Sequence, residues 1–474
     1  MSADTLSHNV GWPAKAGLAL AVLLRVLWPF GSSPTHVDEG GWPFSVRQWA
    51  TDGLVTYDFH TAPGYHLVLG MVFKLAPPVM LTARLFSVCL SLVSLWLLWW
   101  AARRILEDER AAVWAALLWA VCFPANEIAG RALIEPMQLT WLLALLAALC
   151  LTGRGAFTLV AATTAGLLLT KANALVILPA FAAGAYLDLS PALTARHSEK
   201  LAGLGLGMLV AGLAYGGLYL SDPATFVLGW GATMTKATIS SAAPFLRLGR
   251  LVLDPSVAQR LVEFLGSQTP LLFAFGLAGT ARSLLRRQAF GVALWIALLL
   301  PFLLVQVFYS PQYFAMLYPA LAIVAAALLA GVLPAEPGRW RWPALVVGLI
   351  VCDGLGRTAA ALATLQAVER PGVTWMREHA SEGTVLAAPY ILMQLPNRGV
   401  SFYAFAETDY MPNSAGVTIG DWIAVDALEW SPRFEEVGRD SLAVNAYFAG
   451  CCELSFDDGV VRVYRVRRTR SDSR

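Results

Sequence analysis

Residues 80–101 read MLTARLFSVCLSLVSLWLLWWA, an apolar run whose single charge is Arg84. A helix needs about 20 mostly apolar residues to cross roughly 30 Å of hydrocarbon, and this run is long enough. The whole chain has the same character, because 57% of its 474 residues are hydrophobic and only 14% are charged. This composition excludes an ordinary soluble globular protein and indicates an integral membrane protein. We predict an all-α multi-pass protein of the plasma membrane.

Eleven segments, this one included, are apolar for long enough to span a membrane. They lie at residues 13–30, 80–101, 111–127, 134–152, 155–170, 172–189, 201–220, 268–285, 288–308, 312–333 and 342–364. Segment 63–75 is apolar too, but at about 1.5 Å per residue it reaches only about 20 Å. We therefore predict that segment 63–75 is a helix lying on the membrane surface.

Positive charge tests this topology, since Lys and Arg collect in the cytoplasmic loops of multi-pass proteins. With the amino terminus inside and segment 63–75 on the surface, the short-loop cations fall on the inner side. They are Arg103, Arg104, Arg110, Arg154, Arg196, Lys200, Arg282, Arg286, Arg287, Arg339 and Arg341. The outer side then receives residues 31–79, the turn at 131–135, loop 221–267 and the C-terminal tail.

The tail, residues 366–474, is predicted to be a separate extracytoplasmic domain. Residues 384–390, 400–405 and 460–466 are rich in Val and Tyr, as strands are, while 373–379 has a helical pattern. We expect a small α/β domain there. Residues 1–365 form the predicted transmembrane domain, with an outer loop and juxtamembrane helices at 31–79.

Some function classes are excluded by what the chain lacks. A net charge of only +2 offers no basic surface for nucleic acid. No phosphate-cradling GxxxxGKS or GxGxxG motif occurs, nor a GxSxG nucleophile elbow. The chemistry must therefore be sought in polar residues beside the membrane.

Two adjacent carboxylates, Asp38 and Glu39, follow the first predicted span. A carboxylate here can take a proton from an attacking hydroxyl or bind a divalent cation. It can equally begin the helix that residues 42–50 predict, because acidic side chains are favoured in a first turn. His36, His60 and His66 share this loop, although no HExxH-like spacing supports a transition metal.

Other polar residues fall on the same outer side. Arg131 and Glu135 are either an ion pair one helical turn apart, or a phosphate-binding arginine with a second carboxylate. Lys171, with Asn173, interrupts an apolar run, which indicates either function or snorkelling to the interface. Snorkelling is favoured for Arg25, and a membrane-interface aromatic belt for Tyr313.

The acidic pair and its topology resemble the C-type glycosyltransferase fold, in particular the protein O-mannosyltransferases and lipid A aminoarabinose transferases. The resemblance covers about residues 13–333. Its other residues are Pro63, Gly64, Tyr65, Arg84, Arg131, Glu135, Lys171 and the stretch 313–319. Members are inverting enzymes that move a sugar from a polyprenyl phosphate to a hydroxyl on a lipid, protein or glycan.

The resemblance implies a role for each matching residue. Asp38 would be the catalytic base, supported by Glu39. The residues implied to bind the donor phosphate are Arg84, Arg131 and Lys171. Those implied to contact substrate are His60, Tyr65, Glu135 and Tyr313, and those implied to hold a divalent metal ion are Asp38 and Glu135.

Two positions depart from the family pattern. Glu135 stands where aspartate is common, which puts the metal role in doubt. Thr61 and Ala62 stand where a basic residue often precedes the proline, and His60 would have to substitute.

The main alternative is a transporter or flippase of lipid-linked sugars. That class predicts matched Gly or Pro interruptions in two halves and charges at mid-depth, whereas the charges here gather at one surface. A third interpretation, a ligase or polymerase, would use loop 221–267 with Lys236, Arg247, Arg250 and Arg260. We predict the glycosyltransferase, with a polyprenyl-phosphate-linked sugar as donor, a hydroxyl acceptor and the bilayer as partners.

Overall fold

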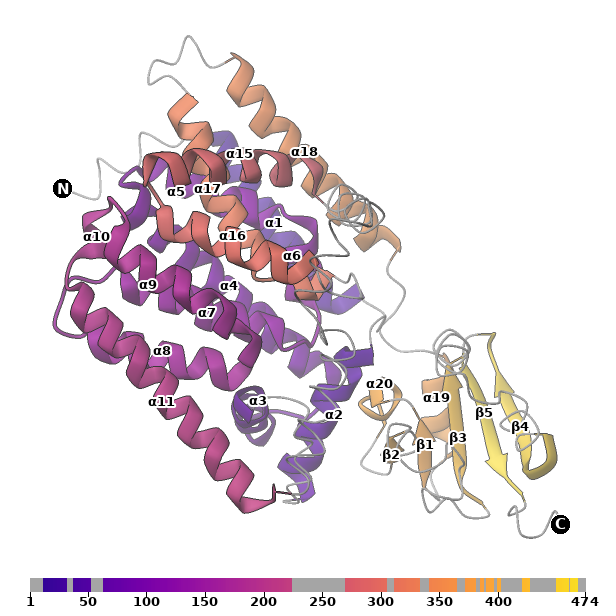
Figure 1. Ribbon diagram of the computed structural model, residues 1–474. Coiled ribbons are helices and arrows are strands. Elements are labelled where there is room, and N and C mark those ends of the chain that lie inside the picture. The colour runs from indigo at the N-terminus through magenta and orange to yellow at the C-terminus, as the bar shows by residue number, and fades with distance from the viewer. Residues whose placement is uncertain are drawn as a thin grey trace, which may run out of the picture. The chain divides into compact units, whose positions relative to one another are not determined.

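The computed structural model describes residues 12–31, 37–52, 63–223, 269–304, 311–332, 341–364, 371–380, 384–387, 389–395, 399–401, 420–426, 449–459 and 461–467 (Figure 1). The chain divides into two compact units. The first consists of Met1–Pro29, Thr56–Val68 and Arg84–Thr364, and the second of Phe30–Val55, Leu69–Ala83 and Leu365–Arg474. This division shares a boundary near residue 365 with the predicted domains, but it groups two N-terminal segments with the tail.

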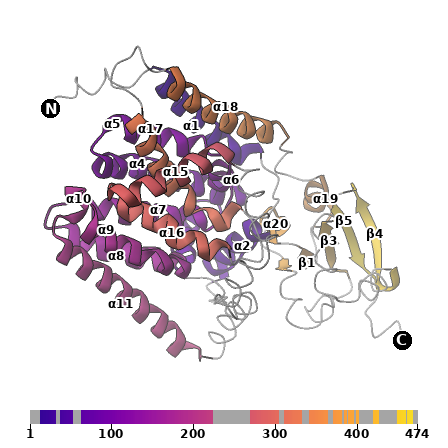
Figure 2. The ribbon, with the colours of Figure 1, turned by 45° about the horizontal axis from the view of Figure 1, so that its top comes forward.

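The first unit is helical. Its helices, some of which continue into the second unit, are α1 (Trp12–Gly31), α3 (Pro63–Leu75), α4 (Met80–Leu106), α5 (Glu109–Ala120), α6 (Phe123–Gly130), α7 (Glu135–Leu149), α8 (Ala156–Thr170), η2 (Ala172–Ile177), α9 (Leu178–Leu187), α10 (Pro191–Thr194), α11 (His197–Ser221), α15 (Pro270–Arg286), α16 (Phe290–Leu304), η3 (Pro311–Phe314), α17 (Leu317–Val332) and α18 (Arg341–Thr364). Helices α8 and α11 pack along each other in both views (Figures 1 and 2).

A helix or helix pair occupies each of the eleven predicted spans. Among the described residues, three helices are long and apolar enough to cross a membrane alone, at Met80–Leu106, His197–Ser221 and Leu345–Ala363. Helices α5 and α6 pass the same test together but are bent by 64°. The all-helical membrane fold is confirmed, while the number of crossings stays a prediction.

Two interruptions break the helical segments where polar residues gather. Cys122 is extended between α5 and α6, and Pro124 lies in the first turn of α6, where a missing N–H costs no intrahelical hydrogen bond. Lys171 is extended between α8 and η2, with φ −158° and ψ 110°.

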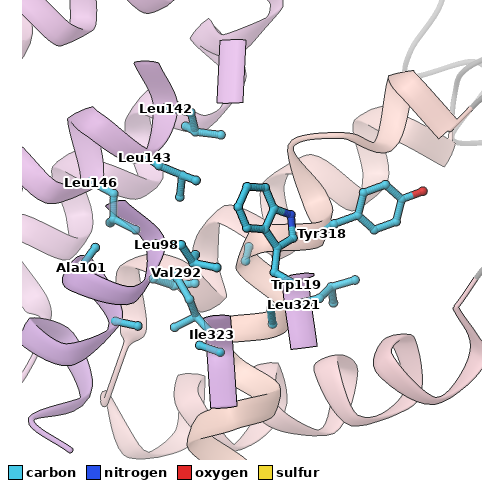
Figure 3. Packing of buried hydrophobic residues seen from close by; sticks show 14 of the residues in the cluster. Leu98, Ala101, Trp119, Leu142, Leu143, Leu146, Val292, Tyr318, Leu321 and Ile323 are labelled. Carbon is cyan, nitrogen blue, oxygen red and sulfur yellow. The ribbon is translucent and has the colours of Figure 1, made fainter. Parts of the chain in front are cut away.

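The core of this unit is built from large side chains on α4, α5, α7, α16 and α17. Trp119 and Tyr318 are fully buried with Leu98, Leu142 and other residues of one hydrophobic cluster. Figure 3 shows the Tyr318 hydroxyl pointing away from the leucines of this cluster. The hydroxyl is buried all the same and has no hydrogen-bond partner among the described residues.

Close helix approach depends on glycine at several crossings, as is common in membrane bundles. A Cβ on Gly279 of α15 would lie 2.2 Å from the Val324 carbonyl oxygen of α17. Gly205 of α11 has open space instead. We expect Gly279→Ala to lower the Tm in detergent, at a cost of about 1–3 kcal/mol from overpacking.

The matched change Gly205→Ala is expected to leave Tm unchanged or slightly raised, because alanine is the better helix former. Equal Tm values for the two variants, measured by thermal unfolding, would contradict the close α15–α17 contact.

The second unit contains a five-stranded mixed sheet with order β2-β1-β3-β5-β4. Its strands are β1 (Val385–Ala387), β2 (Gly399–Ser401), β3 (Trp422–Asp426), β4 (Cys452–Asp457) and β5 (Val461–Val466). The strands β2, β1 and β3 are parallel, and β5 runs antiparallel to both β3 and β4. The predicted small α/β fold of the tail is confirmed, although sequence patterns identified only β1, β2 and β5.

Helix α19 (Pro371–His379) packs against β5 (Figure 2). Its Trp375 ring stacks on His379 at 4.5 Å and on Phe456 at 5.4 Å, between ring centroids. The indole is therefore packed against rings of its own unit.

Helix α2 (Val37–Asp52) belongs to the same unit as the sheet. It packs against α20 (Pro389–Leu392), and Arg47 Nη1 donates to the Leu395 carbonyl at 3.1 Å. The segment that carries Asp38 and Glu39 is thus attached to the C-terminal part of the chain.

Candidate active site

Arg131 lies directly after α6, where the backbone turns extended (φ −100°, ψ 151°). Its Nη2 donates to Glu127 Oε1 at 2.6 Å, one helical turn earlier. Arg131 Nε is buried and has no hydrogen-bond partner in the described part of the chain. This arginine therefore keeps a donor that its carboxylate partner does not use.

Arg131 and Glu135 do not form the ion pair that their spacing allowed. Residues 131–134 lie between α6 and α7, so the helical geometry that brings positions four apart together is missing. Glu127, one turn before Arg131 on α6, takes the position instead. The same spacing on the N-terminal side was the signal that could have identified Glu127.

Glu135 pairs with Lys171 instead. Lys171 Nζ donates to Glu135 Oε1, joining the start of α7 to the interruption after α8. The carboxylate side chain is 6% exposed and the lysine side chain 26%. Snorkelling therefore does not describe Lys171, since its ammonium group is held by a nearly buried partner.

A second polar link runs parallel to this pair. Gln138 Nε2 donates to Asn173 Oδ1 at 2.8 Å, again from α7 to the segment after α8. Gln138, three residues after Glu135, was not identified from the sequence. The two links fix the side chain of Lys171 relative to the first turn of α7.

The four charged residues of this region balance each other. Glu127 and Glu135 hold Arg131 and Lys171 as two separate ion pairs, each only partly exposed. Charge-assisted hydrogen bonds to an incoming phosphate are stronger than neutral ones, and arginine offers a planar fork of donors for it. Each of the two cations is held in place by its carboxylate and offers donors suited to an anion.

Asp38 and Glu39 lie in the first turn of α2, where the helix dipole favours negative charge. Glu39 is fully buried. The side chain of Asp38 lies outside the described part of the structure. The predicted helix over 42–50 is confirmed and begins earlier, at Val37.

Arg84, Tyr65, His60 and Tyr313 complete the predicted set. Arg84 is fully buried and its Nη1 donates at 3.3 Å to the carbonyl of Pro29, among the last carbonyls of α1. Tyr65 is also fully buried, in α3. His60 and the side chain of Tyr313 lie outside the described residues, so their substrate roles stay predictions, as does phosphate binding by Arg84.

The donor set does not fit the implied metal well. Glu135, one of the two predicted ligands, is engaged by Lys171, and no group of three His, Cys, Asp or Glu side chains meets within the described ranges. We therefore assign no step of the chemistry to a metal ion.

Arg25 differs most from its prediction. Snorkelling would expose its guanidinium at the membrane interface, but the residue is 1% exposed and turned into the helical unit. Its Nε donates to Asn126 Oδ1 at 2.9 Å. The snorkelling interpretation was wrong because hydrogen-bond partners on neighbouring helices were not visible in the sequence.

The helical unit carries paired cations and carboxylates at its helix interruptions, and the C-terminal part of the chain contributes a small mixed sheet. Residues 60–215 match the family model described as dolichyl-phosphate-mannose-protein mannosyltransferase. No curated protein sequence matches the chain.

Solved structures share the fold over nearly the whole chain. ArnT from Cupriavidus metallidurans bound to undecaprenyl phosphate has a TM-score of 0.63 at 14% identity, covering 95% of this chain and 97% of that one. The Archaeoglobus fulgidus oligosaccharyltransferase in its apo form has a TM-score of 0.58 at 13% identity, covering 97% and 75%. The predicted C-type fold is confirmed, and the chain is an integral membrane protein.

Proposed function

We propose that the protein is an inverting glycosyltransferase that moves a sugar from a polyprenyl phosphate to a hydroxyl acceptor at the outer membrane face. The main support for this function is the presence of two cations, Arg131 and Lys171, each paired with a carboxylate at a helix interruption. The similar ArnT structure was solved with undecaprenyl phosphate, and a similar Archaeoglobus fulgidus structure with dolichol phosphate. No feature of the described residues favours the transporter alternative.

In the proposed reaction the acceptor oxygen forms a bond to the anomeric carbon while the bond from that carbon to the phosphate oxygen breaks. The leaving phosphate takes the electron pair, so its negative charge grows by one. Arg131 and Lys171 stabilise that charge, and Asp38 accepts the proton of the acceptor hydroxyl. A single displacement of this kind inverts the anomeric configuration.

The proposed location follows from the predicted topology. Asp38, Arg131 and the C-terminal domain all fall on the extracytoplasmic side when the amino terminus is inside. A reporter fused after Arg474 tests this, because activity of the reporter only outside the cytoplasm is expected. A divalent metal stays a prediction; a similar Archaeoglobus fulgidus structure contains zinc and sulfate.

The decisive experiment uses purified protein in proteoliposomes with a panel of labelled polyprenyl-phosphate sugars and hydroxyl acceptors. The proposal expects a new glycosidic bond with inverted configuration. A flippase would instead move labelled lipid across the bilayer with no such bond, which would overturn the proposal.

Arg131→Gln is expected to raise the KM for the donor by about tenfold to a hundredfold, because a charge-assisted phosphate contact is lost. Steady-state kinetics with the donor as the varied substrate measure this.

The matched control is Arg357→Gln, which breaks a similar pair one turn apart, at 2.8 Å from Asp353 on α18. This control should leave the donor KM within about twofold, as is usual for partly exposed pairs. Equal effects of the two substitutions on the donor KM would show that Arg131 does not bind the donor phosphate.

A further inference from the structure

Arg25 is a buried cation on α1, the first of the predicted spans. It is 1% exposed on α1, and no carboxylate of the described residues pairs with it. Placing an arginine in such surroundings is expensive, and an apolar side chain would fill the space at lower cost. Intramembrane charges that persist at this cost commonly serve function.

Within the described residues, the hydrogen-bond partners of Arg25 are neutral groups on three other helices. Nε donates to Asn126 Oδ1 of α6 at 2.9 Å, and Nη1 to Ser91 Oγ of α4 at 2.9 Å. Nη2 lies 3.5 Å from the Trp119 carbonyl of α5, and the guanidinium lies 5.0 Å from the Trp119 ring centroid. The Arg25 guanidinium therefore contacts α5, before the interruption, and α6, after it.

The network continues through Asn126. Its Nδ2 donates to Thr358 Oγ1 of α18 at 3.2 Å, so α6 is tied to both α1 and α18. Helix α6 has only 8 residues and its N-cap side chain makes no hydrogen bond. A helix this short has little stability of its own, and its orientation depends on such tertiary contacts.

Helix α6 is also the element that presents the proposed phosphate site. Asn126 directly precedes Glu127, and Arg131 follows the last residue of the helix. A displacement of about 1 Å in a positioned group can cost about a hundredfold in rate even when the cause lies far from the chemistry.

We propose that Arg25 is a positioning residue, which through Asn126 sets the orientation of α6 and hence the placement of the Glu127–Arg131 pair toward the donor phosphate. This inference rests on the proposed function of Arg131. Arg25 touches no substrate in this role.

The test is a double-mutant cycle in proteoliposomes with Arg25→Met, Arg131→Gln and the double variant. Arg25→Met is expected to raise the donor KM by about tenfold and to leave the acceptor KM unchanged. In the Arg131→Gln background the same substitution should have almost no further effect on the donor KM, because the group that it positions is gone. Asn126→Ala should reproduce the effect of Arg25→Met.

Lys200→Met is the matched control. Lys200 is likewise buried, and among the described residues its Nζ donates to the backbone carbonyls of Ala192 at 2.7 Å and Leu193 at 2.9 Å. Its removal should lower Tm without changing the donor KM.

Equal donor KM values for wild type and Arg25→Met, or full additivity with Arg131→Gln, would overturn the positioning role. If Arg25→Met does not fold, Asn126→Ala supplies the same cycle. Absence of transfer by the wild-type protein from every polyprenyl-phosphate sugar would instead contradict the proposed function itself.

Discussion

Replacing Asp38 with Asn is expected to lower transfer by about 10²–10⁴-fold, the usual contribution of a general base. The amide keeps the size of the carboxylate but cannot take the proton of the acceptor hydroxyl at neutral pH. Transfer from a polyprenyl-phosphate sugar, measured under single-turnover conditions in proteoliposomes, reports the chemical step directly. Donor binding should persist in the variant, because the phosphate is assigned to other residues.

The matched control for this substitution is Asp108→Asn. Asp108 caps α5, where its Oδ1 accepts from the Arg110 N–H at 2.8 Å, and asparagine caps a helix about as well. Transfer by this variant should stay within about twofold of wild type. If Asp38→Asn transferred sugar as fast as this control, Asp38 would not be the base.

Breaking the Lys171–Glu135 pair should produce the second large effect, on both stability and activity. Lys171→Met leaves the nearly buried Glu135 carboxylate without its cation, which typically costs about 3–5 kcal/mol for a buried pair. We expect a lower Tm in detergent together with loss of transfer, because the second phosphate cation is removed.

The double variant Lys171→Met/Glu135→Met separates the two effects. It removes the unpaired charge as well, so Tm should return toward the wild-type value while transfer stays low. If sugar transfer recovered together with Tm, Lys171 would have only a structural role and would not bind the donor phosphate.

Arg196→Met serves as the control for this pair. It breaks an exposed ion pair with Glu199, 3.1 Å apart, and such pairs are worth about 1 kcal/mol or less. If Arg196→Met lowered Tm as much as Lys171→Met does, the burial of Glu135 would not be the reason for the stability lost in Lys171→Met.

Helix α3 shows how much a local pattern can predict. Its bounds, Pro63–Leu75, agree with the segment defined from flanking prolines and apolar residues. The apolar runs likewise predicted the helical membrane unit, since hydrocarbon admits few other backbone structures. In the tail, richness in Val and Tyr predicted β5, where Val461 and Val463 are buried and Arg462 is exposed.

Which charged residues form ion pairs could not be predicted from the sequence. Arg131 could have paired with Glu127 or Glu135, which are equally distant along the chain, and the choice depends on where α6 ends. Strand β3 was missed because its residues Trp422–Asp426 are almost all buried between β1 and β5 and do not alternate in polarity.

The sequence by itself determined that this chain lies in a membrane as a helical bundle with a small α/β tail, because hydrophobicity and its period act locally. Only the tertiary structure decided that Lys171 pairs with Glu135 and that Arg25 is buried against Asn126. The physical reason is that a buried charge is stabilised by whichever polar groups distant segments bring to it, and sequence spacing does not encode that meeting.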